Sequence, residues 1–389
     1  MDPAERRVEA DVVVIGGGAT GSGVAWDLAL RGLRVMLVEK GDLSSGTSGR
    51  YHGLLHSGAR YATSDLETAR DCMTENRVVR RILPGSVDET GGMFVLLPGD
   101  DHSFVERWIA GCRAAGISVR ELTASQARAK EPSLNPEMLC AFEVPDAVCH
   151  SMTLCASLSR GARSQGATIL PFHRVEAILR HNGRVEGVRV NDLQKGATWE
   201  VRARFIVNAA GPWAGEVAAL ADIPLSLDLT RGALVAYKGR LVNSAVQRMR
   251  PPDDADAMLP RGQVSIAGTT EVVTQDPGDR RVEDWEPDLI RERLSELLPT
   301  LGGATAVHAW SAVRPLYDPK ARADGTDTRL RSRGFTILDH SRTDNVEGIA
   351  SVVGGKLAIF RLMAEKTSDL VCERLGIDVP CRTADTQLG

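Results

Sequence analysis

The sequence predicts an α/β fold made of two lobes. The chain has 389 residues, more than one simple core usually needs. Residues 11–15 (DVVVI) and 34–39 (RVMLVE) have the character of buried parallel strands, and residues 19–30 between them that of a helix. From about residue 222 to 330 the pattern changes to strands separated by polar, proline-containing loops. We therefore expect a Rossmann-like βαβ lobe and a second lobe with a mixed sheet.

Cap and stop signals bound the next helix. Ser64 and Glu67 have capping-box spacing ahead of a helix that we expect to end near residue 83, just before the Pro84-Gly85 pair. Residues 86–145 are expected to hold short strands and one helix.

A hairpin signal follows at Asn182-Gly183, which predicts a type I′ turn within a strand pair over residues 175–190. Strands are further expected at 204–209, 232–237, 335–338 and 348–353, a charged loop at 318–333, and an amphipathic helix at 357–375 that Gly376 closes.

These elements divide the chain discontinuously. Residues 1–85, 146–221 and 331–389 are assigned to the nucleotide-binding lobe. Residues 86–145 and 222–330 are assigned to a substrate or cap lobe, which is inserted twice.

A glycine-rich turn joins the first strand to the first helix. Gly16, Gly18 and Gly21 form a G-x-G-x-x-G motif, and Glu39 ends the following strand. In this context the motif indicates a dinucleotide site, because the glycines allow a tight turn, a close approach of the pyrophosphate and close helix packing. The helix N-terminus suits phosphate, and Glu39 can accept hydrogen bonds from ribose hydroxyls.

The motif alone does not separate FAD from NAD. A second turn, residues 208–211 (NAAG), ends a later strand. It resembles the Ala-x-Gly turn that closes over FAD in two-lobed flavoenzymes, although such a turn by itself is usually a packing feature. The two segments together favour FAD.

Composition excludes several function classes. The net charge is −4 with no long run of one sign, which argues against a nucleic-acid partner. The seven cysteines contain no C-x-x-C pair, so we expect no metal site and reduced thiols in a cytoplasm. No apolar stretch of about 20 residues is present, so no membrane-spanning helix is expected. Peripheral contact with a membrane needs only a surface patch and stays compatible with the sequence.

Three segments carry cationic candidates for an active site. They are residues 52–61 (HGLLHSGARY), Arg314 within 310–316 (WSAVRPL), and Lys356 after a glycine pair. The small residues of the first segment would let it lie against a flat ring. The helix that begins after Lys356 could stabilise negative charge on a reduced flavin through its positive end. Each cation taken singly is more often a partner in a surface salt bridge.

The chain resembles the FAD-dependent glycerol-3-phosphate dehydrogenases, and most of all the catalytic subunit of the anaerobic, multi-subunit type. The segments that carry the resemblance are residues 11–62, 204–214, 310–316 and 354–365. The resemblance implies a two-lobed FAD-dependent oxidoreductase with a Rossmann-like FAD domain. It implies oxidation of sn-glycerol 3-phosphate to dihydroxyacetone phosphate, with electrons passed to quinone directly or through partner subunits.

The resemblance also implies roles for individual residues. Arg60, Tyr61, Arg314 and Lys356 would bind the phosphate substrate, and His56 would lie near flavin N5. His56 and Arg314 are the catalytic candidates, with His52 an alternative base. The expected FAD contacts are Gly16, Gly18, Ala19, Thr20, Gly21, Glu39, Lys40, Thr47, Ser48, Gly49, His56, Ser57, Gly58, Ala210, Gly211, Gly355, Lys356 and Leu357.

Elementary chemistry agrees with these roles. Oxidation of a secondary alcohol removes a hydride and a hydroxyl proton, and a positioned base such as His56 helps by about 10²–10⁴-fold. A phosphate dianion needs cations with fixed donors, which two arginines and a lysine supply.

The chain also departs from the family pattern. Ile359 and Phe360 replace a common Thr-Tyr pair, Val353 replaces a common Thr, and Ala312 a common Gly. If the hydroxyl groups that are common at these positions contact the substrate in the family, we expect this chain to prefer another polyol phosphate. The anaerobic type carries a cysteine-rich iron–sulfur domain after this region, so we expect either a different electron exit or a longer natural chain.

Two alternatives stay open. A relative of the same fold could act on an amine, an amino acid or a 2-hydroxy acid, or the chain could be a flavin-binding subunit without catalysis. The expected location is the cytoplasm, with peripheral attachment to the inner face of the cell membrane compatible with the sequence.

Overall fold

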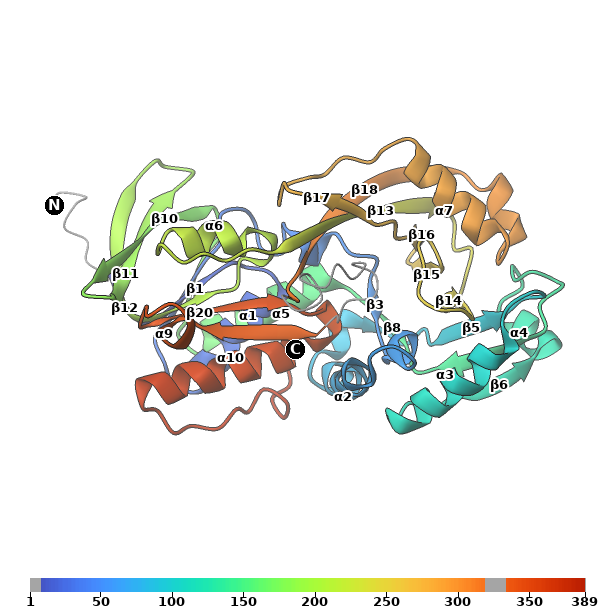
Figure 1. Ribbon diagram of the computed structural model, residues 1–389, viewed down its shortest axis with the longest axis horizontal. Coiled ribbons are helices and arrows are strands. Elements are labelled where there is room, and N and C mark those ends of the chain that lie inside the picture. Colours follow the sequence, from blue (N-terminus) through green and yellow to red (C-terminus); the bar gives the residue numbers. More distant parts are fainter. Residues whose placement is uncertain (1–7, 319–333, 389) are drawn as a thin grey trace.

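The computed structural model describes residues 8–318 and 334–388, which form two large sheets and one small one. In Figure 1 the first large sheet lies at one end of an elongated molecule, and the strands of the second extend to the other end. The eight-stranded sheet consists of β1 (Val8–Ile15), β2 (Val35–Val38), β9 (Thr168–Leu170), β10 (His173–His181), β11 (Arg184–Asp192), β12 (Thr198–Asn208), β19 (Phe335–Asp339) and β20 (Ile349–Gly354).

The central part of this sheet is parallel. Strand β1 pairs in parallel with β2 and β12, and β20 continues in parallel beside β12. Side chains alternate along β1: Val12 and Val14 belong to the core on the side of helix α1 (Ala19–Leu30), while Val13 and Ile15 belong to the core on the opposite face. Burial on both faces explains why these strands are continuous apolar runs.

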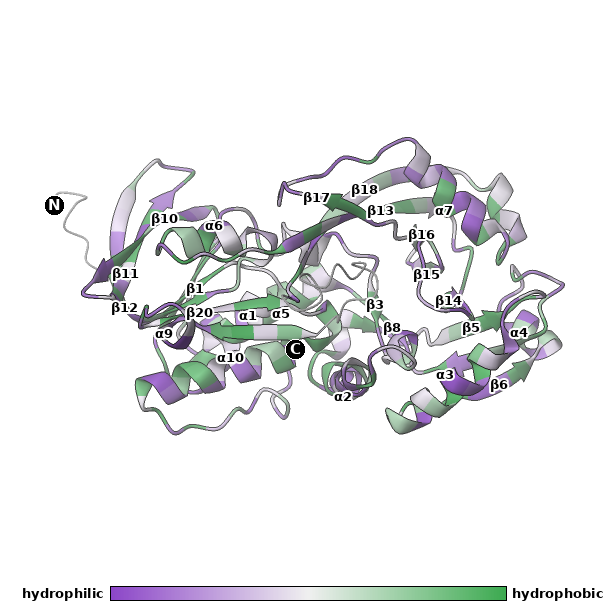
Figure 2. Cartoon of the chain, viewed as in Figure 1, coloured by the Kyte–Doolittle hydropathy of each residue, from purple (hydrophilic) through white to green (hydrophobic). Residues whose placement is uncertain are grey.

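The helices around this sheet have different surroundings. Helix α1 packs against α5 (Ser151–Ser164) and α10 (Phe360–Leu375), and nearly all of its residues are buried. Figure 2 shows hydrophobic and hydrophilic residues alternating along α10, which has one face toward solvent. The opposite face of the sheet packs against α6 (Ala214–Ala219).

The second large sheet is mainly antiparallel, apart from the parallel β5–β14 pair. Its nine strands are β5 (Gly92–Leu96), β6 (Arg120–Thr123), β7 (Cys140–Val144), β13 (Asp228–Lys238), β14 (Ala245–Arg248), β15 (Ala257–Arg261), β16 (Val264–Gly268), β17 (Val272–Thr274) and β18 (Ala306–Leu316). The long strands β13 and β18 pair along their whole length, and β18 also contacts β20 of the eight-stranded sheet (Figure 1).

The remaining elements connect or cover the sheets. A three-stranded sheet is formed by β3 (Leu54–Leu55), β4 (Val87–Asp88) and β8 (Ala147–Cys149). The other α-helices are α2 (Leu66–Ile82), α3 (His102–Ala114), α4 (Ala124–Lys130), α7 (Trp285–Ser295) and α9 (His340–Thr343). Short 3₁₀ helices span Thr47–Gly49, Ala59–Tyr61, Pro84–Ser86, Gly211–Trp213, Pro299–Gly303 and Leu357–Ile359.

Several predicted elements are confirmed. Helix α1 has the expected bounds, and β10 and β11 form the expected hairpin. Asn182 and Gly183 both have positive φ, 50° and 78°, as a type I′ turn requires. The helix predicted at 357–375 begins as a 3₁₀ turn and becomes α-helical at Phe360, and Gly376 closes it with φ 69°.

Two local predictions were wrong. Asp65, and not Ser64, caps α2: its carboxylate accepts a hydrogen bond from the Thr68 N–H at 3.0 Å. The helix begins at Leu66, so Glu67 lies too early in the first turn to close a capping box. Residues 86–145 hold two helices, α3 and α4, instead of one. The charged loop predicted at 318–333 lies almost entirely outside the described residues.

Within the described ranges, no helix combines the length and apolar character that crossing a membrane requires.

Candidate active site

The main cavity has a volume of about 810 Å³, within the usual size of ligand sites. Residues of both large sheets and of the loops after β2 and β20 line this cavity. All four predicted substrate-binding residues, Arg60, Tyr61, Arg314 and Lys356, line it. The predicted cofactor contacts on the wall are Ala19, Thr20, Thr47, Ser48, His56, Gly211, Gly355, Lys356 and Leu357.

The glycine turn has the close contacts that its motif predicts. Gly16 has φ 113°, and a Cβ atom there would lie 2.5 Å from the carbonyl oxygen of Ala209. A Cβ atom at Gly21 would lie 1.9 Å from the carbonyl oxygen of Gly16. Side chains therefore cannot be accommodated at these two positions while the turn keeps its shape. Gly18 is the N-cap of α1, and its own Cβ atom would meet only the Ser48 side chain, at 3.0 Å.

Glu39 and Ser48 hold the backbone around this turn. The two carboxylate oxygens of Glu39 accept hydrogen bonds from the N–H groups of Gly17 and Gly41, each at 2.7 Å. A carboxylate has further lone pairs, so Glu39 can still accept bonds from ribose hydroxyls. Ser48 Oγ accepts a bond from the Ala19 N–H at 3.0 Å, at the N-terminus of α1.

The second predicted turn is held by a chain of buried polar groups. Asn208 Nδ2 donates to Ser351 Oγ at 3.1 Å, and Asn208 Oδ1 accepts from the Ala210 N–H at 3.3 Å. His340 lies 2.8 Å from Ser351 Oγ through Nε2 and 2.7 Å from Asp344 through Nδ1. The turn that brings Gly211 to the cavity is thereby tied to β20 and α9.

Other predicted cofactor residues lie outside the cavity wall. Gly58 packs against α2, because its Cβ atom would lie 2.3 Å from the carbonyl oxygen of Ala69. Ser57 is fully buried next to it. Gly49 lies in the 3₁₀ turn Thr47–Gly49, and Lys40 Nζ lies 3.8 Å from the ring centroid of Trp213.

His56 is a buried imidazole, 7% exposed, at the cavity wall. Burial, and then the charges of neighbours such as His52 and Lys356, lower the pKa of His56 well below its usual 6.5. The ring is therefore neutral at neutral pH and offers one acceptor nitrogen. Its Nδ1 atom has no hydrogen-bond partner in the described part of the chain.

His52 differs from His56 in its hydrogen bonding. The two ring centroids are 5.9 Å apart. His52 Nδ1 accepts a bond from the Leu54 N–H at 2.9 Å, so in the neutral ring the proton is on Nε2. Burial, and then the charges of Arg60 and Arg314, lower the pKa of His52 to about 3. Since the acceptor nitrogen of His52 is already occupied, His56 is the one of these two histidines whose Nδ1 atom has no partner among the described residues.

Arg60 is not an isolated cation. Its guanidinium forms an ion pair with Asp256 at 2.9 Å and donates to the Asp253 carbonyl oxygen at 3.1 Å. Burial opposes the charge of Arg60, but the Asp256 carboxylate outweighs it, and the pKa is raised. The contact of this acidic loop with Arg60 was not predicted from the sequence. Nothing in the local sequence of the loop indicates that it folds against a pocket lined by cations.

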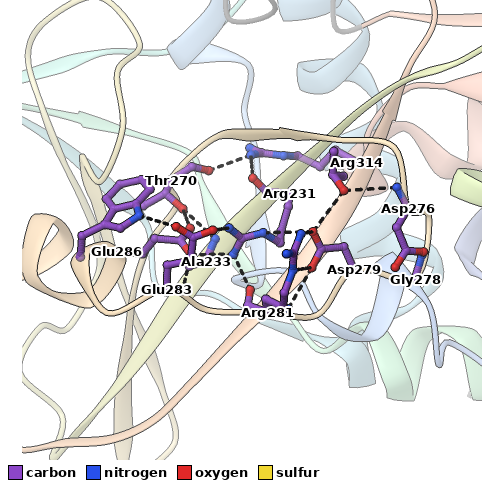
Figure 3. A network of polar contacts seen from close by, with 12 residues as sticks. Arg231, Ala233, Thr270, Asp276, Gly278, Asp279, Arg281, Glu283, Glu286 and Arg314 are labelled. Atoms are coloured by element: carbon purple, nitrogen blue, oxygen red, sulfur yellow. Dashed lines mark hydrogen bonds and ion pairs between the residues drawn. The ribbon is translucent and has the colours of Figure 1, made fainter.

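Arg314, on β18, is fixed by a network that Figure 3 shows. Its guanidinium donates to the Thr270 carbonyl oxygen at 2.7 Å and to Thr269 Oγ1 at 3.2 Å. Thr270 Oγ1 in turn donates to Glu286 at 2.6 Å, and Glu286 pairs with the fully buried Arg231, also at 2.6 Å. These partners hold the Arg314 guanidinium in place before any ligand binds.

Lys356 lies at the start of the last helical segment. Its Nζ atom is 4.0 Å from the ring centroid of Tyr61, in cation–π geometry. Gly355 has φ 75°, and a Cβ atom there would lie 2.5 Å from Met363 Sδ. The glycine therefore lets the backbone approach Met363 closely at the cavity wall.

The residues that depart from the family pattern have different environments. Ile359 and Phe360 are buried in the apolar core around α1, and Val353 is 1% exposed on β20. None of these three forms part of the cavity wall, whereas Ala312 does. The three positions that lack the common hydroxyl group therefore alter the packing of the protein core. Of the four departures, only Ala312 alters the lining of the cavity.

Several residues that the fold brings to the cavity were not predicted from the sequence. Gln247 on β14 and the 251–257 loop reach it from the second sheet. Asp146, 1% exposed, lies just behind it and accepts a hydrogen bond from the Ser57 N–H at 2.6 Å. No spacing in the sequence connects these segments, which meet because β14 pairs with β5 and β5 with β7 in the second sheet.

The geometry fits FAD. The glycine turn has close backbone contacts and no space for side chains at Gly16 and Gly21, and the N-terminus of α1 adjoins the same cavity that Arg314 and Lys356 line. Among the described residues, no group of His, Cys, Asp or Glu is placed to hold a metal ion.

Comparison with known proteins also identifies the chain as an FAD-dependent oxidoreductase. Residues 11–355 match the family model described as FAD dependent oxidoreductase (DAO). The chain is 43% identical over 386 residues to a subunit of the anaerobic glycerol-3-phosphate dehydrogenase of Haloferax volcanii, covering 97% of this chain and 66% of the relative. It is 42% identical over 381 residues to the corresponding subunit of the Escherichia coli enzyme, covering 97% and 70%. It thus spans about two thirds of these relatives.

Solved structures show the same fold. Glycerol-3-phosphate dehydrogenase from Bacillus halodurans complexed with FAD superposes with a TM-score of 0.75 at 24% identity, covering 100% of this chain and 68% of that one. Glycine oxidase from Geobacillus kaustophilus has a TM-score of 0.75 at 22% identity, covering 98% and 99%. The sequence match, the glycine turn and the shared two-lobed fold place this chain in the family of FAD-dependent oxidoreductases, among the relatives of the anaerobic glycerol-3-phosphate dehydrogenases, with FAD as its cofactor.

Proposed function

We propose that the protein oxidises sn-glycerol 3-phosphate to dihydroxyacetone phosphate. The observation that supports this most is the convergence of Arg60, Arg314 and Lys356 with the neutral His56 on one cavity that also reaches the dinucleotide turn. The relatives from Haloferax volcanii and Escherichia coli are named for this activity. A phosphate dianion suits such a set of fixed donors better than a monoanionic carboxylate does.

In this proposal each residue has a separate task. Lys356 and Arg314 bind the phosphate, with Arg60 beside them, and so hold the carbon that reacts at a fixed place. His56 accepts the hydroxyl proton. FAD, when bound, accepts the hydride. Tyr61 supports Lys356 through the contact of its ring with Nζ.

The direct test is anaerobic mixing of the FAD-loaded protein with sn-glycerol 3-phosphate, other polyol phosphates, amino acids and 2-hydroxy acids. We expect loss of the oxidised-flavin absorbance with glycerol 3-phosphate. Bleaching with another class of substrate, but not with this one, would reject the assignment. FAD that none of them reduces would favour a flavin-binding subunit without catalysis.

A variant at Lys356 tests the phosphate contact. Lys356→Met should raise KM for the phosphate ester by about 10–100-fold, because a charge-assisted hydrogen bond is lost. A weak carboxylate substrate should be affected far less. Lys238→Met, at an exposed position on β13, is the matched control and should leave both KM values unchanged. Equal losses for both substrate classes would contradict phosphate binding by Lys356.

Three finer points are also part of this proposal. Electrons leave to a quinone, directly or through partner subunits. The names of the relatives, which are subunits, support the partner subunits. The proposed location is the cytoplasm, and peripheral attachment to the inner face of the cell membrane is compatible with it. The division into an FAD lobe (1–85, 146–221 and 331–389) and a cap lobe (86–145 and 222–330) remains a proposal, and its boundary at 330/331 lies outside the described residues.

A further inference from the structure

Gln247 combines burial with an unmet hydrogen-bonding group at the cavity. It lies on β14, is 1% exposed and lines the main cavity. Its Nε2 group donates to Asp146 Oδ2 at 3.2 Å. Its Oε1 atom has no hydrogen-bond partner among the described residues. A buried acceptor without a partner costs free energy, so a partner supplied by a ligand would be favoured.

Asp146 determines which way the amide of Gln247 faces. The nitrogen end faces Asp146 Oδ2, because two acceptor oxygens facing each other would repel. Burial raises the pKa of Asp146, and the hydrogen bonds from Ser57 and Gln247 oppose this shift by favouring the ionised carboxylate. Asp146 is itself held, since its Oδ1 atom accepts a bond from the Ser57 N–H at 2.6 Å. The oxygen of Gln247 is therefore the end that remains available to another group.

The chemistry of an amide oxygen selects its partner. It accepts hydrogen bonds and cannot donate one, so it would repel phosphate or carboxylate oxygens. It needs an O–H or N–H group of the substrate. Gln247 therefore cannot belong to the phosphate-binding set of Arg314 and Lys356, and must serve another part of the molecule.

We propose that Gln247 Oε1 accepts a hydrogen bond from the terminal hydroxyl of the polyol phosphate, and so selects substrates that carry this hydroxyl. This inference rests on the proposed function. Among the described residues of the cavity wall, two side chains hold a buried acceptor without a hydrogen-bond partner, the neutral His56 and Gln247, and glycerol 3-phosphate has two hydroxyls. His56 takes the reacting hydroxyl and Gln247 the other. Asp146 joins the two sites, because it binds Gln247 and the backbone of Ser57, the residue next to His56.

The test uses two substrates that differ only in the terminal hydroxyl, sn-glycerol 3-phosphate and the matching enantiomer of propane-1,2-diol 1-phosphate. With the FAD-loaded wild-type protein, kcat/KM should be about 10–100-fold lower for the deoxy compound. In Gln247→Met, kcat/KM for glycerol 3-phosphate should fall by about 10–100-fold, while that for the deoxy compound should change by less than about threefold. Gln263→Met, an exposed position beside β16, should alter neither value.

Each other outcome overturns the inference. An equal loss for both substrates in Gln247→Met would mean that Gln247 acts only by holding Asp146 and the segment of His56. Equal kcat/KM values for the two substrates in the wild-type protein would reject a contact with the terminal hydroxyl, even if the variant failed to fold. If neither compound reduces the wild-type flavin but another class of substrate does, the proposed function fails and this inference fails with it.

Discussion

His56 shows how the cavity changes the properties of a single side chain. A histidine in water is partly protonated near pH 6.5, and the protonated ring cannot accept a proton. Burial and nearby positive charge make protonation of His56 costly. The same surroundings that favour a phosphate anion thus keep the proposed base in its active form.

We expect His56→Gln to slow flavin reduction by glycerol 3-phosphate by about 10²–10⁴-fold while FAD remains bound. The measurement is anaerobic stopped-flow absorbance. His52→Gln serves as the comparison and should have a much smaller effect, because the acceptor nitrogen of His52 is already bonded to Leu54. A larger loss in His52→Gln than in His56→Gln would reverse this assignment.

The pH dependence follows from the direction of the shift. The base works when it is neutral, and the pKa of His56 is lowered well below 6.5. Activity that depends on His56 should therefore be constant above pH 6.5 and fall only as the pH drops through the lowered pKa. The expectation would be contradicted if the flavin reduction rate of the wild-type protein changed with a midpoint at or above pH 6.5, and if this transition were absent in His56→Gln.

At the scale of elements, a buried ion pair joins α10 to α2. Arg361 Nε donates to Glu75 Oε2 at 2.7 Å, and both side chains are almost completely buried. Arg361 also contacts Glu365 and Thr383. Burial raises the pKa of Glu75 although Arg361 lies beside it. The pair fixes α10, which follows Lys356 and the 3₁₀ turn Leu357–Ile359, against α2, which follows Tyr61.

Arg361→Met should lower the free energy of unfolding by about 3–5 kcal/mol, because Glu75 would remain buried without its partner. Urea denaturation followed by circular dichroism measures this. The exposed Arg342–Glu373 pair provides the control, and Arg342→Met should cost less than about 1 kcal/mol. The double variant Arg361→Met/Glu75→Met should regain much of the loss, and no recovery would argue against an uncompensated charge as the cause.

At the scale of the whole molecule, the cavity joins parts of the chain that are far apart in sequence. The glycine turn, the 208–211 turn, β18 and the start of the last helix all contribute to it or adjoin it. A ligand that contacts all of them binds only the folded chain. FAD should therefore stabilise the two lobes together.

We expect FAD at 100 times its Kd to raise the free energy of unfolding by about 2.7 kcal/mol, seen as a higher Tm. Gly21→Ala should weaken FAD binding by about 10–100-fold and reduce this shift, because its Cβ atom would overlap the Gly16 carbonyl oxygen. Gly85→Ala, where an added Cβ atom meets nothing within 4 Å, should keep the full shift. A full shift in Gly21→Ala would mean that the turn does not hold the cofactor.

The sequence by itself determined the βαβ unit, the glycine turn and the hairpin at Asn182, because apolar periodicity and backbone conformation are local properties. The family motifs also indicated which cations would meet. Only the tertiary structure decided that Asp256 pairs with Arg60, that Thr270 and Glu286 fix Arg314, and that Gln247, bonded to Asp146, lines the same cavity as His56. Those residues come together through the pairing of distant strands, both parallel and antiparallel, and through the loops and helices that adjoin them. The free energy of such contacts has no signature in the spacing of residues along the chain.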